Sequence, residues 1–346
     1  MMRLSNNAGL QRGAAALVAD HMSVAAGESV LISADTASDM AAVEAVMTAA
    51  HRQGAKPMVA LIPQLPFQGK LADPYLPSSL TGALLDSDVW IDMTHPFIAG
   101  SDAHDKAMKG NRLRGLGAGG LDSPGLARLY GATDLDALFA VQSGLDRLIV
   151  ESAGKTCRLT DDLGTDVSFV LAPGGQPKKR RAQGPGMNTI PGSVVMLPEL
   201  KSVRGTIRLV AAMHEYYTAL QRPLTLEVDG QIQRIVESGP DAQLLDRALR
   251  RAGRGGYGYV IHFSIGLHPA ARFTGKCFVE DIRVIGANAI GLGMPWWEAG
   301  GGENHPDGVV LRQSLSIDGQ DVLRHGLIVW PDTLAAQAAA LLPRFD

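Results

Sequence analysis

Short apolar runs alternate with helix-type segments along the first half of the chain. The apolar runs at residues 29–33, 57–62 and 88–93 predict buried strands. In residues 10–22 and 41–53, apolar residues recur every three or four positions, which predicts amphipathic helices. Strands that alternate with such helices are typical of βαβ units. We therefore expect an α/β N-terminal domain that has a parallel sheet with flanking helices.

The second half of the chain has a different pattern, in which β-type segments come in pairs. Asp229-Gly230 and Asp318-Gly319 each separate two such segments, and Asp-Gly favours the positive φ angles of tight hairpin turns. Leucines three or four positions apart predict a helix over residues 241–251. We therefore expect an antiparallel α+β C-terminal domain over residues 151–346, after an α/β domain over residues 1–150.

Two glycine-rich stretches resemble loops. Residues 172–192 are rich in glycine and proline and carry the basic run 178–181, so they predict an exposed loop. Residues 115–120 contain four glycines but lack the full spacing of a dinucleotide-binding motif. We interpret this second stretch as a loop or a tight packing turn.

Composition and charge exclude several classes of protein. The chain is 46% hydrophobic and 19% charged, which is enough apolar material for a large core. A net charge of −3 at pH 7 argues against a binder of nucleic acid. Neither a run of about 18 apolar residues nor the apolar core of a signal peptide is present, so we expect a cytoplasmic protein without a membrane partner. Two distant cysteines, Cys157 and Cys277, predict neither a disulfide framework nor a thiolate metal site.

Histidines of the second half lie in glycine-rich surroundings. In residues 259–269, His262 is close to the end of a predicted strand and His268 lies just beyond it. Residues 286–295 are mostly small, so a ligand or another segment can approach them closely. A histidine in an apolar strand is more often a hydrogen-bonded core residue than a ligand, and that alternative stays open for His262.

A third segment adds a carboxylate to these histidines. In an extended chain, His305 and Asp307 point the same way, because side chains alternate with period two. Together with His262 they match the set of two histidines and one carboxylate that non-haem Fe(II) oxygenases use. The alternative is an ordinary turn, in which Asp307 accepts hydrogen bonds from the backbone.

Seven short motifs occur in an order and spacing that resemble one known family. They lie at residues 27–32, 54–57, 163–166, 190–194, 265–269, 290–293 and 305–307. The family is the aminopeptidase T type of metallo-aminopeptidase, and the resemblance implies an N-terminal α/β domain and a C-terminal metal-binding domain. These peptidases hold two metals with glutamates at the positions of Ser193 and His262 and a histidine at the position of Ala289. A two-metal peptidase site is therefore not expected here.

The pattern of His262 followed by His305-x-Asp307 is instead similar to 2,5-dihydroxypyridine 5,6-dioxygenase, a ring-cleaving member of the same superfamily. That resemblance implies that these three residues hold a single Fe2+ and that a hydroxylated N-heteroaromatic compound reacts there with O2. The dioxygenase also has a serine near its iron, where this chain offers Ala289 and Gly291. Water or an oxygen of the substrate would then take the fourth position.

Four further residues are candidates for the surroundings of the metal. Glu303 is a candidate catalytic proton acceptor for a ring hydroxyl. His95, Ser193 and His268 are candidate substrate-binding residues, and His95 follows a predicted strand at the edge where α/β sheets bind ligands. The plain alternatives are a solvated loop carboxylate for Glu303 and a turn before Pro96 for His95.

Two other functions remain open at this stage. One is a metal-dependent hydrolase of the aminopeptidase or amidase type, in which Zn2+, Mn2+ or Co2+ activates water. The other is a binding or structural subunit without catalysis, because Ala289 removes a ligand position of the peptidases. For the dioxygenase we expect a small aromatic substrate and O2 as partners, and a homo-oligomer.

Overall fold

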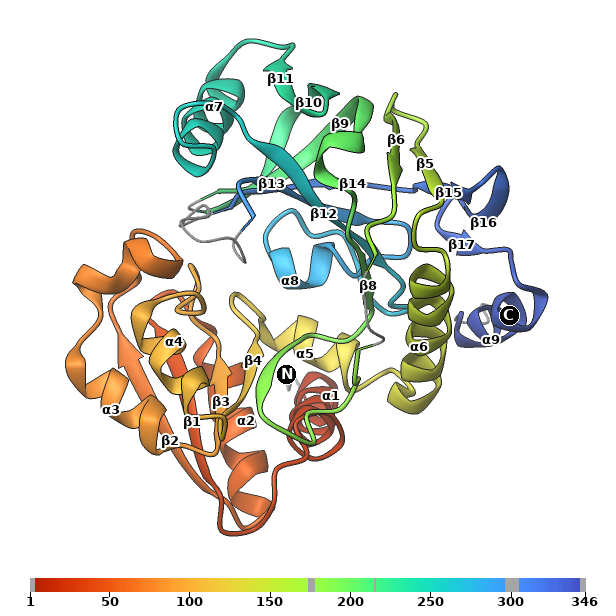
Figure 1. Cartoon of the computed structure of the whole chain (residues 1–346). Coiled ribbons are helices and arrows are strands. Elements are labelled where there is room, and N and C mark those ends of the chain that lie inside the picture. Colours follow the sequence, from red (N-terminus) through yellow and green to blue (C-terminus); the bar gives the residue numbers. More distant parts are fainter. Residues whose placement is uncertain (1–3, 174–177, 215, 296–304, 343–346) are drawn as a thin grey trace. The chain divides into compact units, whose positions relative to one another are not determined.

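The computed structural model describes residues 4–173, 178–214, 216–295 and 305–342 (Figure 1). Its internal contacts divide the chain into two units. One consists of residues 1–135 and 179–191, and the other of residues 136–178 and 192–346. The sequence pattern predicted a boundary near residue 150, at the end of helix α6 (Leu135–Glu151), whereas the contacts assign α6 to the second unit because its buried face belongs to that unit's core.

The N-terminal unit contains a parallel sheet, as the alternating pattern predicts. The strand order is β2-β1-β3-β4-β7, and every pairing is parallel. The strands are β1 (Ser29–Asp35), β2 (Lys56–Ile62), β3 (Val89–Asp92), β4 (Arg114–Gly117) and β7 (Gly186–Thr189). The three predicted strands are confirmed as β1, β2 and β3.

Helices connect and flank these strands. They are α1 (Leu4–Ala15), which continues as a π-helix (Ala16–His21), α2 (Met40–Arg52), a 3-10 helix (Gly69–Tyr75), α3 (Ser78–Asp86), α4 (Asp102–Lys109) and α5 (Ser123–Leu129). In α2, the Asp39 carboxylate accepts hydrogen bonds from the backbone N–H groups of Ala41 and Ala42, which satisfies donors that the first turn leaves open.

The structure differs from two predictions that rested on glycine content, those for residues 172–192 and 115–120. Residues 172–192 are not one exposed loop, because Gly186–Thr189 forms β7 and pairs with β4. The glycine stretch at 115–120 begins inside a strand, and a Cβ atom at Gly115 would lie 2.1 Å from the sulfur of Met187. Both strands have four residues and few apolar side chains, so neither has a recognisable alternating pattern.

The C-terminal unit is built on a 12-stranded sheet in which every pairing is antiparallel. Ten strands follow the order β17-β16-β15-β5-β6-β9-β14-β13-β12-β8, β10 also pairs with β9, and β11 pairs with β10. The strands are β5 (Thr156–Thr160), β6 (Asp166–Val170), β8 (Ser193–Met196), β9 (Arg204–Met213), β10 (Tyr217–Asp229), β11 (Gln231–Ile235), β12 (Tyr259–Gly266), β13 (Asn288–Gly293), β14 (Asp307–Val310), β15 (Ser314–Ile317), β16 (Gln320–Arg324) and β17 (Leu327–Ile328).

The predicted hairpins and helix of this unit are confirmed. Asp229-Gly230 joins β10 to β11, Asp318-Gly319 joins β15 to β16, and both glycines have positive φ angles. The predicted helix is α7 (Pro240–Ala252). The other helices are α6, a 3-10 helix (Leu200–Ser202), α8 (Phe278–Asp281) and α9 (Asp332–Leu341).

Alternation along β12 gives the sheet one packed face and one face that carries polar side chains. Phe263 and Ile265 belong to the hydrophobic core, to which α6, α7 and α9 also contribute. Phe263 stacks on Phe169 of β6, with ring centroids 4.3 Å apart. His262, which precedes Phe263, and Ser264, which follows it, therefore project from the opposite face.

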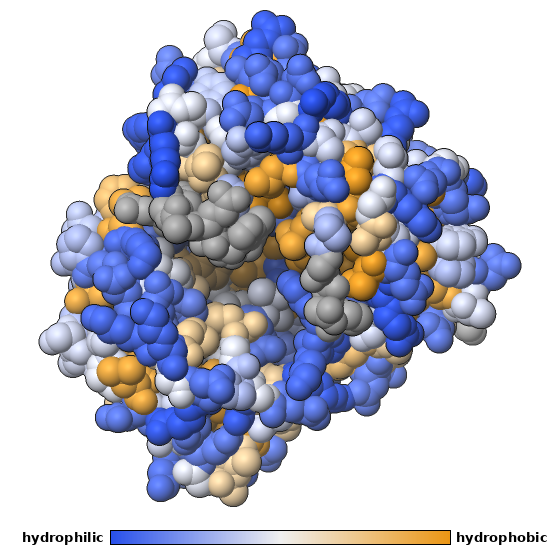
Figure 2. Space-filling view, in the orientation of Figure 1, coloured by the Kyte–Doolittle hydropathy of each residue, from blue (hydrophilic) through white to orange (hydrophobic). Residues whose placement is uncertain are grey.

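Hydrophilic residues predominate on the face shown in Figure 2, with smaller apolar areas between them. Among the residues that the structure describes, no helix has the length and apolar composition needed to cross a membrane.

Candidate metal centre

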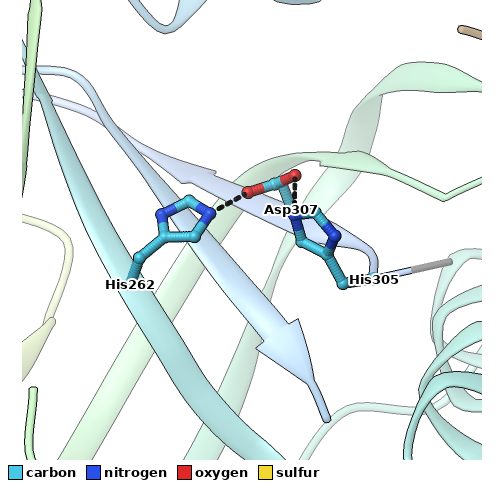
Figure 3. A group of neighbouring side chains, drawn as sticks. All are labelled: His262, His305 and Asp307. Carbon is cyan, nitrogen blue, oxygen red and sulfur yellow. Dashed lines mark ion pairs between the residues drawn. The ribbon is translucent and has the colours of Figure 1, made fainter. Parts of the chain in front are cut away.

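His262, His305 and Asp307 converge on one point of the C-terminal unit (Figure 3). One ligand atom from each residue lies within 4.8 Å of the other two. The Nε2 atom of His262 is 3.2 Å from Oδ1 of Asp307, and Nε2 of His305 is 3.6 Å from Oδ2 of the same carboxylate. His262 belongs to β12, Asp307 begins β14, and His305 precedes that strand by two residues.

A β-bulge at Ile261 aims His262 at this point. The pairing of β12 with β13 shifts between Val260 and His262, so that Ile261 is an extra residue. Strict alternation would place Val260 and His262 on the same face of the strand. Val260 instead faces the core together with Phe263, three residues further on. Because a bulge re-aims the side chains that follow it, the imidazole leaves the core face.

Gly291 lies between the two ligand strands. The register places His262 opposite Gly291 and Gly291 opposite Asp307, so the three residues form one row across β12, β13 and β14. A Cβ atom at Gly291 would lie 2.4 Å from Nε2 of His262. Since glycine has no side chain, the imidazole can cross β13 and reach the carboxylate. The row continues to Met213 and Tyr217 in β9 and β10.

Charge and burial favour the ligand forms of these side chains. Burial lowers the pKa of His305, against the effect of the neighbouring Asp307. Burial would raise the pKa of Asp307, but the polar contact with His262 and charge interactions, that of Arg283 among them, outweigh it and lower that pKa. A neutral imidazole and an ionised carboxylate are the forms that bind metal.

The three residues fit a divalent cation. Oδ1 of Asp307 is buried and accepts no hydrogen bond from the described residues that meets ordinary geometry, so the contact with His262 leaves its lone pairs available. Buried carboxylate oxygens normally have such partners or bind a cation. Neighbouring ligands at about 2.1 Å from an ion lie about 3 Å apart, which small side-chain rotations would achieve here.

The other candidates of this unit lie outside the cluster of three. Ser193 begins β8 and pairs with Gly266, four residues along β12 from His262. Its carbonyl accepts a hydrogen bond from Nε2 of Gln142 at 2.8 Å. His268 is fully buried, and its Nδ1 accepts a 3.2 Å hydrogen bond from the backbone of Ala270. A substrate-binding role for Ser193 and His268 stays a prediction.

His95 and Glu303 also stay predictions. His95 belongs to the N-terminal unit, where its backbone N–H donates a 2.6 Å hydrogen bond to the Asp35 carboxylate. Its carbonyl accepts another from Nε2 of Gln64, and burial lowers the pKa of its imidazole. Glu303 lies outside the described residues.

Sequence reasoning selected the ligand candidates but missed the two features that bring them together. The bulge at Ile261 leaves one trace in the sequence, which is the spacing of three between the core residues Val260 and Phe263. The small residues at 286–295 did indicate a place of close approach, but that Gly291 is the residue His262 crosses depends on the register of three strands.

Two solved structures share this fold. A 2,5-dihydroxypyridine dioxygenase from Pseudomonas putida KT2440 is 20% identical with a TM-score of 0.70, and the match covers 95% of this chain and 99% of that one. Aminopeptidase T (AmpT) from Thermus thermophilus is 14% identical with a TM-score of 0.61, and the match covers 93% and 99%. The predicted aminopeptidase T-like fold, with its parallel and antiparallel sheets in separate domains, is confirmed.

The sequence comparisons identify the family. A search of curated proteins found no match. The family model described as 2,5-dihydroxypyridine 5,6-dioxygenase (NicX) matches residues 16–330, a range that includes His262, His305 and Asp307. The resemblance inferred from short motifs is thereby confirmed, and the chain belongs to the 2,5-dihydroxypyridine 5,6-dioxygenase family.

Proposed function

We propose that this protein is a mononuclear non-haem iron dioxygenase that cleaves the ring of a hydroxylated N-heteroaromatic compound, with 2,5-dihydroxypyridine as the first candidate. The observation that carries the proposal is the convergence of His262, His305 and Asp307 within 4.8 Å in a chain of this family. A cytoplasmic location and a homo-oligomeric state are part of the same proposal.

The ligand set suits Fe2+. Nε2 of each histidine and one Asp307 oxygen would hold the ion, and three protein ligands leave coordination positions open on one side. Bound Fe2+ would supply the redox chemistry by which O2 reacts with an electron-rich ring. The protein holds the ligand atoms in position. Strands β12 and β14 set the directions of His262 and Asp307, and Gly291 has no side chain that would fill the space between them.

The hydrolase alternative has less support. The resemblance to aminopeptidase T shows a shared fold, and folds host unrelated chemistries. Ser193 and His262 stand where those peptidases would have glutamates, and the described residues offer one cluster of three ligand-type side chains. With a single carboxylate, that cluster has too little negative charge to hold two divalent cations close together.

Oxygen uptake tests the proposal directly. The protein is loaded anaerobically with Fe2+ and mixed with 2,5-dihydroxypyridine and O2, and we expect stoichiometric uptake with loss of the ring absorbance. Asp307→Ala should lose both uptake and bound iron, whereas Ser316→Ala in β15 should keep both. Cleavage of aminoacyl nitroanilides without oxygen uptake would contradict the proposal and favour the hydrolase.

A further inference from the structure

We propose that Ser264 contacts the ligand of this site, by a hydrogen bond from its hydroxyl to an oxygen substituent of the aromatic ring. This inference rests on the proposed function, because the dioxygenase reaction defines the ring. Nothing in the sequence pattern singles out Ser264, and it is not among the three metal-ligand candidates.

Ser264 lies on the same face of the sheet as those ligands. It follows His262 by two residues in β12, beyond the bulge, while Phe263 between them points into the core. Its partner across the ladder is Ala289 in β13, one row away from the row of His262 and Gly291. The serine therefore stands in the row next to the metal ligands.

The hydroxyl of Ser264 has no partner in the part of the chain that the structure describes. The residue is 5% exposed, and its backbone N–H donates a 2.7 Å hydrogen bond to Oδ1 of Asn288, but no described group bonds to Oγ. Its neighbours in the same row are Ala289 and Val309 on one side and Val195 on the other. None of these side chains has a polar atom, and the Ser264 Oγ is not among the described side-chain oxygens that are closed off from solvent, so a ligand can reach it.

The spacing of the two rows fits a ring compound. Residues two apart in a strand are about 6.7 Å apart, which is close to the span of an aromatic ring with its substituents. A ring that reaches the cation through one oxygen would bring another substituent to the row of Ser264. A hydroxyl donates as well as accepts, so it suits both a phenolic OH and its anion.

Ligand binding without turnover tests this role. Wild-type protein and Ser264→Ala, each loaded with Fe2+, are titrated anaerobically with 2,5-dihydroxypyridine. We expect equal metal content and about tenfold weaker ligand binding by the variant, and in turnover a higher KM with a smaller change in kcat. Adding Ala289→Ser to the variant should restore part of the affinity, because it returns a hydroxyl to the same row.

Controls separate this role from a structural one. Ser316→Ala removes a serine from another strand of the same sheet and should leave ligand affinity unchanged. The metal-free Ser264→Ala protein should melt close to the temperature of the wild type, since the hydroxyl makes no hydrogen bond within the described part of the chain.

Unchanged ligand affinity in Ser264→Ala would overturn the inference, and so would a lower melting temperature together with loss of metal. If the wild type binds Fe2+ but neither binds nor oxidises dihydroxypyridines, the proposed function is wrong. The proposed contact of Ser264 with an aromatic ligand is then wrong as well.

Discussion

His262 and Asp307 meet at 3.2 Å although the whole of strand β13 separates their two strands. The contact is possible because the residue between them is Gly291. Adjacent strands are about 4.8 Å apart, so the two backbones are about 9.6 Å apart, and the imidazole spans about half of that distance. This contact therefore requires a small residue in the middle strand.

Gly291→Ala should therefore impair metal binding. Its methyl group would lie 2.4 Å from Nε2 of His262, so the imidazole must rotate away from Asp307. We expect at least about tenfold weaker metal binding, about 1.4 kcal/mol, in a competition titration with a chelator. Gly117→Ala is a matched control, because a Cβ atom there meets nothing within 4 Å. Wild-type metal affinity in Gly291→Ala would mean that His262 is not a ligand in this orientation.

Metal should stabilise the folded wild-type protein and not the ligand variants. A ligand that binds only the folded state adds about 2.7 kcal/mol of stability at a concentration of 100 Kd. We expect added Fe2+ under anaerobic conditions to raise the melting temperature of the wild type. In His305→Ala and Asp307→Ala the rise should disappear, and in Cys157→Ser it should remain. Equal rises in all four proteins would exclude a specific site at these residues.

The core face of β12 packs directly beneath the candidate site. Phe263 is fully buried between His262 and Ser264 and stacks on Phe169 at 4.3 Å. Phe263→Ala should lower the free energy of unfolding by about 3–5 kcal/mol, measured by urea denaturation. It should also weaken metal binding, because the direction of β12 would relax. Phe263→Leu should cost less and keep the metal, and a similar loss of metal in that variant would contradict this account.

An ion pair in the N-terminal unit predicts how stability depends on pH. Arg114 donates two hydrogen bonds to the Glu28 carboxylate, at 2.9 and 2.6 Å, and these lower the pKa of Glu28 against the opposing effect of burial. A carboxyl whose pKa is lower in the folded state stabilises the fold above its ordinary pKa of about 4.5. That contribution is lost as the pH falls through the folded-state value.

Glu28→Gln should therefore reduce stability by about 1 kcal/mol at pH 7 and much less at pH 3. Urea unfolding of both proteins from pH 7 to pH 3 measures the difference. The two stability curves should converge on the acid side. Curves that stay parallel over this range would show that the ion pair has no effect on stability.

The sequence predicted the long and strongly patterned parts of the fold. Strands β1, β2 and β3 have clear apolar runs, and the Asp-Gly turns of the second half form hairpins because they tolerate positive φ angles. The sequence pattern did not predict strands β4 and β7, because each has only four residues, with glycine at positions where a longer strand would have apolar side chains. Their pairing is long-range, and no local pattern encodes it.

In the candidate site, too, some residues could be predicted from the sequence and others only from the folded structure. Residue chemistry and family resemblance were enough to select His262, His305 and Asp307. The importance of Gly291 and Ser264 comes from register, which places residues of three strands in the same or the next row. Register depends on the bulge at Ile261 and on the packing of the opposite face, so it became visible only with the folded chain.

The insertion of β7 into the parallel sheet has a consequence for dissecting this protein. Residues 179–191 return to the N-terminal unit after the chain has already entered the C-terminal one. A fragment truncated at residue 150 would lack its last strand and expose the backbone edge of β4, which invites self-association. Neither unit is thus encoded by one continuous segment of the sequence. A fragment designed to contain only the N-terminal unit must therefore include residues 179–191 or a substitute for β7.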